Sequence, residues 1–111
     1  MNESILRSVS KDLGIDYDDT SFDSEIIRHI NSIFFILEDL GIGPAEGFEI
    51  EDDTAVWSDF INETSNKKLR AVKTFVYLRV KILFDPPTNS TALESLKSTA
   101  AEYEWRLTNK K

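Results

Sequence analysis

The residues Phe84-Asp85-Pro86-Pro87 decide the fold, because they separate two long stretches with helical periodicity. Pro86 and Pro87 lack an amide donor and clash with the preceding turn, so neither can continue a helix. Before them, apolar residues recur every three or four positions, the spacing of one helical face: Leu69, Val72, Phe75, Val76, Val80 and Leu83. After them, the same spacing occurs at Leu93, Leu96, Ala100, Tyr103 and Leu107. The pattern predicts a C-terminal hairpin of two antiparallel helices that turns near Asp85.

Two further helices are predicted before this hairpin. The first is short and runs from Ser4 to Leu13, with Gly14 as its stop. The second begins at Thr20 or Ser21, with Thr20 and Asp23 at the spacing of a capping box. The second helix has a wide apolar stripe: Phe22, Ile26, Ile27, Ile30, Ile33, Phe34, Leu37 and Leu40, broadened by Phe35 and Ile36. A stripe this wide requires enclosure by the chain's own fold or by a neighbouring subunit.

The middle of the chain is the least helical part. Phe48-Glu49-Ile50-Glu51 alternates apolar and polar residues, so a short strand or hairpin near residues 45–53 is an alternative to a loop. Residues 54–61 are expected to form two helical turns, and Thr91 with Glu94 has capping-box spacing at the start of the last helix. The predicted fold class is therefore all-α: a bundle of about four to five helices that ends in the Pro-Pro-broken hairpin. A length of 111 residues suits one domain spanning residues 1–111.

Charge is distributed unevenly along the chain, whose formal net charge is −7. Residues 1–63 hold 16 acidic and 3 basic side chains, whereas residues 64–111 hold 4 acidic and 10 basic ones. Opposite signs in the two halves favour attraction within one molecule. They equally favour stacking of copies, with the acidic face of one against the basic face of the next. Both interpretations stay open, and both can hold at once.

Composition and motifs exclude several classes of protein. The chain has no cysteine, so it has no disulfide framework and no thiolate metal site. Its N-terminus lacks a signal-peptide pattern, and its apolar runs are shorter than the roughly 20 residues that span a bilayer. His29 is the single histidine and is expected to be structural, because no nucleophile or metal ligand is spaced to work with it. We therefore expect no enzymatic activity, no cofactor and no metal.

Short motifs along the chain carry a family resemblance: Leu13-Gly14-Ile15-Asp16, Asp23-Ser24-Glu25-Ile26-Ile27, Ile30-Asn31-Ser32, Leu40-Gly41-Ile42-Gly43-Pro44, Ala71-Val72-Lys73-Thr74, Tyr77-Leu78, Leu83-Phe84-Asp85-Pro86-Pro87 and Glu102-Tyr103-Glu104-Trp105-Arg106-Leu107. Together they resemble the head–tail connector (adaptor) family of tailed bacteriophages and their prophage relatives, over nearly the whole chain. The Phe-Asp-Pro-Pro and Glu-Trp-Arg-Leu elements are the most specific.

The resemblance implies an α-helical virion protein, made in the host cytoplasm, that takes part in head completion. It would form a ring beneath the portal after DNA packaging and lengthen the DNA channel. The implied partners are the portal protein, a stopper or tail-completion protein, further copies in a twelve-fold ring, and double-stranded DNA passing transiently through the lumen. No membrane partner is implied. In relatives the C-terminal region docks on the portal, so the candidate portal or partner contact consists of Trp105, Arg106, Lys110 and Lys111.

A ring of identical subunits needs two different, complementary surfaces on each copy. The candidate subunit interface therefore pairs residues from the two halves: basic Lys67, Lys68, Arg70 and Lys73 with acidic Glu51, Asp52 and Asp53. An alternative function is an acidic helical inhibitor or immunity-type protein that binds a basic nuclease. The acidic half fits that alternative, whereas the basic half and the wide apolar stripes favour the connector.

Overall fold

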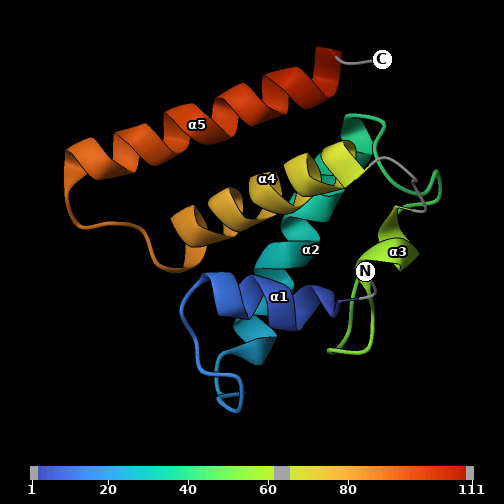
Figure 1. The fold of residues 1–111 in the computed structure, drawn as a ribbon, viewed down its shortest axis with the longest axis horizontal. Helices are drawn as coiled ribbons and strands as arrows, with labels where there is room; N and C mark the ends of the chain where they lie inside the picture. The colour runs from blue at the N-terminus through green and yellow to red at the C-terminus, as the bar shows by residue number, and fades with distance from the viewer. Residues whose placement is uncertain (1–2, 62–65, 110–111) are drawn as a thin grey trace.

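Five helices and no strand make up the described part of the chain (Figure 1). The computed structural model describes residues 3–61 and 66–109. The helices are α1 (Ile5–Asp12), α2 (Asp23–Asp39), α3 (Trp57–Phe60), α4 (Asn66–Phe84) and α5 (Ser90–Asn109). In Figure 1, α5 runs beside α4 in the opposite direction, while α1 and α2 pack against each other and against α4. The all-α prediction and the antiparallel C-terminal hairpin are confirmed.

Helix α1 forms as its sequence pattern predicts. The Ser4 hydroxyl oxygen accepts a hydrogen bond from the Arg7 amide at 3.1 Å, which satisfies one of the free donors at the helix start. Ile5, Leu6 and Val9 point inward and are buried. The helix therefore places one apolar face on the core and leaves the guanidinium of Arg7 near the start of α2.

Helix α2 begins later than predicted, and the Thr20–Asp23 capping box is wrong. Phe22 occupies the N-cap position without a side-chain cap, and Thr20 contributes only its backbone carbonyl to the Asp23 amide. The Asp23 carboxylate instead accepts a hydrogen bond from the Arg7 guanidinium. A charge-assisted bond of this kind is stronger than a neutral cap, and its partner is 16 residues away in sequence.

The apolar stripe of α2 is only partly enclosed. Its central residues are buried as predicted: Ile26, Ile30, Ile33, Phe34 and Leu37. Ile36 packs at the core edge, but the Phe35 side chain is 65% exposed and Phe22 is 41% exposed. The described part of the fold therefore leaves an aromatic side chain uncovered on the outer face of α2.

The segment between α2 and α3 is a loop, so the alternative of a strand near residues 45–53 is wrong. The Asn31 side chain takes the place of a neighbouring strand. Its Nδ2 donates to the Ile50 carbonyl at 3.0 Å, and its Oδ1 accepts from the Ile50 amide at 2.8 Å. Helix α3 is a single turn rather than two, and it buries Trp57 and Phe60.

The turn of the hairpin follows the prolines as expected, but its cap differs from the prediction. Helix α4 ends at Phe84, and α5 begins at Ser90. The Asn89 side chain accepts a hydrogen bond from the Ala92 amide at 3.0 Å, so Asn89 caps α5 in place of Thr91. Across the hairpin, Arg79 Nη2 donates to Glu104 Oε1 at 2.7 Å. This ion pair and the burial of Ala100 and Leu107 hold α5 on α4.

The predicted inward stripe of α4 holds at Val76, which is fully buried, but not at Leu83, which is 50% exposed. Leu83 lies in the last turn of α4 on a side that faces away from the core, whereas the next residue, Phe84, packs against it. We expect Val76→Ala to lower the free energy of unfolding by about 2 kcal/mol, because it opens a cavity. Leu83→Ala should lower it by less than about 1 kcal/mol, because half of that side chain is already in water. Urea denaturation of the two variants measures both values, and equal losses would contradict this placement.

Candidate interaction surfaces

His29 takes part in local packing on α2. Its Nε2 lies 3.8 Å from Glu25 Oε2, and its ring meets the edge of Phe84 at a centroid distance of 6.5 Å. Among the residues that the structure describes, no three histidine or carboxylate side chains gather as metal ligands do. No described helix is long and apolar enough to cross a membrane.

The three acidic residues proposed for a subunit contact lie in the loop before α3, in different environments. Asp52 Oδ1 accepts hydrogen bonds from the Thr54 hydroxyl at 2.6 Å and from the Thr54 amide at 3.0 Å. These bonds, the hydroxyl first, lower the pKa of the Asp52 carboxyl below its ordinary value. Asp53 Oδ2 lies 3.4 Å from Arg7 Nε, while Glu51 is exposed. Two of the three carboxylates thus have interactions within the molecule.

The basic candidates lie at the beginning of α4. Lys68 and Arg70 are exposed, whereas the Lys67 side chain lies outside the described residues. Lys73 Nζ lies 3.3 Å from Glu3 Oε1 and 5.8 Å from the centre of the Trp57 ring. Lys73 therefore ties α4 to the N-terminal segment. Among the described residues, no ion pair joins Arg70 or Lys73 to Glu51, Asp52 or Asp53 within one copy.

The candidate portal contact lies on the outer side of α5. Trp105 is 66% exposed, and Arg106 is exposed with its Nη2 2.9 Å from Glu102 Oε2. Trp105 is two residues from buried Leu107, which places it on a different side of the helix. Lys110 and Lys111 lie outside the described residues. An aromatic side chain beside an arginine is typical of the residues that dominate binding energy in protein interfaces.

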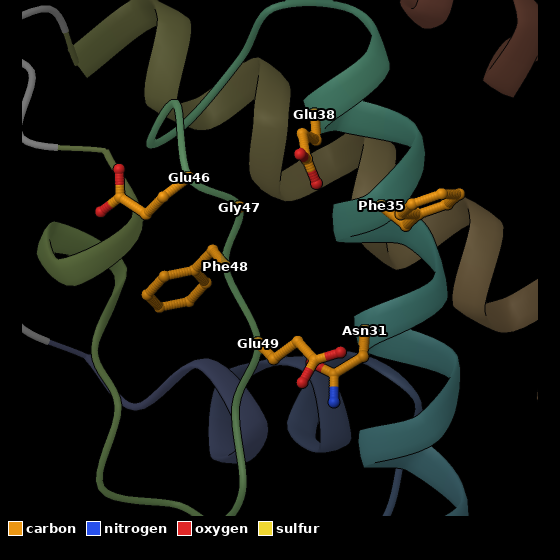
Figure 2. Close-up of a pocket in the computed structure, with 7 residues that line it drawn as sticks. All are labelled: Asn31, Phe35, Glu38, Glu46, Gly47, Phe48 and Glu49. Atoms are coloured by element: carbon orange, nitrogen blue, oxygen red, sulfur yellow. The ribbon is translucent and has the colours of Figure 1, made fainter.

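A surface pocket that sequence analysis missed lies between α2 and the loop that follows it (Figure 2). Its volume is about 350 Å³. We call it the glutamate pocket; its lining residues are Asn31, Phe35, Glu38, Glu46, Gly47, Phe48 and Glu49. In the sequence, Phe35 was the one residue that could have indicated this surface, because it is an aromatic residue at the margin of the buried stripe of α2. The loop's proximity to α2 could not be inferred from the sequence.

Both sides of the glutamate pocket are anchored to the core. The Phe48 ring packs edge-on against Phe34 and lies against Phe60, each at a centroid distance of 5.3 Å. Two residues further on, the Asn31 side chain fixes the backbone of Ile50. The loop is therefore held on each side of Glu49, and the pocket exists before any partner arrives.

Comparison with known families identifies one match. No curated protein and no solved structure matches the chain. A family model described as "Phage connector protein" matches residues 5–111, which is almost the entire sequence. The chain therefore belongs to the phage connector protein family, and it is a structural protein of the phage virion that contacts other head and tail proteins at the head–tail junction.

Proposed function

We propose that this protein forms a ring between the portal and the stopper or tail-completion proteins, and that the ring extends the DNA channel at the head–tail junction. The observation that carries the proposal is the family match over residues 5–111. The protein would be made in the host cytoplasm and join the head once DNA packaging is complete. We expect the ring to adopt the twelve-fold symmetry of the portal.

The position of α5 supports a role in docking. This helix packs mainly against α4, so much of its outer surface is exposed. Trp105 and Arg106 provide an aromatic anchor and a guanidinium on that surface. We infer that this part of α5 contacts the portal or another partner protein.

The distribution of charge supports self-association through different surfaces on neighbouring copies. Arg70 is exposed near the beginning of α4, where basic residues are concentrated. The loop before α3 contains acidic residues, so the two regions have opposite formal charges. Each exposed ion pair contributes only about 0–1 kcal/mol, so several pairs must act together. Raised salt should loosen such a ring, because the Debye length falls from about 10 Å at 0.1 M to about 3 Å at 1 M.

Complementation of a phage that lacks this gene tests the proposal. Without the protein we expect DNA-filled heads and separate tails, and the wild-type gene should restore joined particles. A gene with Trp105→Ala and Arg106→Ala should give at least about tenfold fewer infectious particles, because truncating an aromatic anchor typically costs more than one tenfold step in affinity. The matched control is Glu94→Ala with Thr99→Ala, two exposed positions elsewhere on α5.

Two results would count against the proposal. Joined, infectious particles in the absence of the gene would refute the connector function. Full complementation by the gene with Trp105→Ala and Arg106→Ala would refute the docking role of α5 but not the connector function. Both side chains are exposed, so the variant is expected to fold.

A further inference from the structure

Helix α5 lies at the margin of the fold and is attached along one narrow seam. In Figure 1 it runs beside α4 at the edge of the molecule, and α1 and α3 lie on the far side of α4. Among the described helices, α5 packs extensively only with α4. Its inward stripe is incompletely covered: Ala100 and Leu107 are buried, whereas Leu93, Leu96 and Tyr103 are half-buried.

The seam between α4 and α5 is largely separate from the main core. Leu78 on α4 and Ala100 on α5 are both buried, yet neither belongs to the core cluster. Helix α5 meets that cluster only toward its end, through Tyr103 and Leu107. If α5 left, the body formed by α1–α4 would keep nearly all of its buried apolar residues. A part of a protein that shares few buried contacts with the rest opens at a lower free energy than the whole molecule unfolds.

The ion pair across the seam adds little to the attachment. Arg79 Nη2 donates to Glu104 Oε1 at 2.7 Å, but about a third of each side chain is exposed to water. The Arg79 guanidinium also lies 5.6 Å from the centre of the Phe75 ring, so α4 supports it without Glu104. Arg79 Nε is buried and has no hydrogen-bond partner in the described chain. When α5 leaves, water can solvate this guanidinium, which offsets part of the lost bond.

The two helices are fixed independently at the ends of the segment 85–89. On the side of the body, the Phe84 ring meets the edge of Phe22 at a centroid distance of 5.4 Å, which holds the end of α4 on α2. On the other side, the Asn89 side chain accepts a hydrogen bond from the Ala92 amide at 3.0 Å. Helix α5 therefore has its own N-cap and needs no contact with the body to keep its first turn.

The residues between these two ends are free to change direction. Within the described part of the chain, no hydrogen bond joins residues 86–88 to the rest of the molecule. Pro86 and Pro87 prevent the segment from becoming part of either helix. Domain motions are typically absorbed by a few such residues between rigid elements. Segment 85–89 thus has the construction of a hinge.

We propose that α5 swings away from α4 as one intact helix, about residues 85–89, when the protein joins the head. The arrangement in Figure 1 is the closed form, and α1–α4 remain one body throughout. A partner opens the hinge only if it binds the open form more tightly. Opening uncovers the apolar surfaces at Leu78 and Ala100, which the partner buries in exchange. The inference rests on the proposed function for the event that opens α5.

Hydrogen exchange of the isolated protein tests whether α5 opens as a separate unit. Protection factors of amides 100–107 in α5 should be at least about tenfold lower than those of amides 72–80 in α4. Glu104→Gln removes the ion pair across the seam and should speed exchange in α5 about two- to fivefold without changing α4. The matched control is Glu102→Gln, because Glu102 pairs with Arg106 on the same helix and should not affect the seam. Equal protection of the two helices, or equal acceleration of both by Glu104→Gln, would overturn the proposal.

A lock across the seam tests whether opening is required. The chain has no cysteine, so Arg79→Cys and Glu104→Cys in one protein provide the only two thiols. A short bifunctional thiol reagent joins them, since these long side chains span more than a disulfide tolerates. The locked protein should join portal-bearing heads at least about tenfold less than the same protein untreated. The matched control carries Glu94→Cys and Lys97→Cys, which the reagent joins within α5, and should join heads equally with and without treatment.

The outcomes separate this inference from the proposed function. Equal joining by the locked and untreated proteins would overturn the hinge and leave the connector function standing. Failure of the untreated Arg79→Cys and Glu104→Cys protein, where the wild type joins, would also overturn the hinge, because a looser seam should not hinder opening. Failure of the wild-type protein to join heads would overturn the proposed function together with the event that opens α5. The exchange measurement is independent of that last result, because it uses the isolated chain.

Discussion

Replacing Trp57 with alanine is expected to lower the free energy of unfolding by about 3–5 kcal/mol. The side chain is 1% exposed and meets the edge of Phe34 at a centroid distance of 6.3 Å. Its Nε1 donates a hydrogen bond to the Ser8 hydroxyl at 2.9 Å, which joins α3 to α1. Alanine would leave a large cavity at this junction and remove the donor.

The second tryptophan provides the matched control. Trp105 is 66% exposed, so Trp105→Ala should change the free energy of unfolding by no more than about 0.5 kcal/mol. Trp57→Phe should cost less than alanine, because it keeps most of the apolar volume and mainly loses the bond to Ser8. Urea denaturation followed by far-UV circular dichroism measures all three variants. Similar losses for Trp57→Ala and Trp105→Ala would contradict the core described here.

Replacing Asn31 with alanine is expected to lower the free energy of unfolding by about 2–3 kcal/mol. The substitution removes two hydrogen bonds at once and leaves the amide and carbonyl of Ile50 without their partner. Ile50 is 2% exposed, so water cannot readily replace the side chain. The loop that forms one wall of the glutamate pocket should then detach from α2 more often.

Ser32 supplies the control for Asn31, because it is the next residue on α2 and its side chain is exposed. Ser32→Ala should change stability by no more than about 0.5 kcal/mol. Hydrogen exchange at the Ile50 amide provides a local readout and should accelerate in Asn31→Ala but not in Ser32→Ala. Unchanged exchange at Ile50 in the Asn31→Ala protein would show that the side chain does not hold the loop.

Local patterns predicted the helices, whereas contacts between distant residues decided the details that were missed. The breaks at Gly14 and Pro86 could be predicted because each acts on its own segment. The Thr20–Asp23 cap failed because Asp23 binds Arg7, which lies 16 residues earlier. The alternative of a strand, suggested by alternation at residues 48–51, was wrong because the Asn31 side chain satisfies the backbone of Ile50 across 19 residues.

The interaction surfaces also depend on contacts between distant residues, so sequence patterns could predict them only in part. The sequence shows how many charges each half contains, but not which of them have partners within the molecule. Within the molecule, Asp53 lies near Arg7, and Lys73 lies near Glu3. The glutamate pocket depends on a loop folding back on α2, and such a placement follows from tertiary packing rather than from local periodicity. Trp105 was identifiable from sequence because its offset from the buried stripe of α5 is a local property.

A reconstruction of the head–tail junction in mature particles tests the central claim most directly. The account predicts a ring of copies of this helical fold between the portal and the tail-completion proteins, with the DNA channel through its centre. It further predicts that α5 faces a partner protein. Density between portal and tail that other proteins fill completely, with no copy of this chain, would contradict the account.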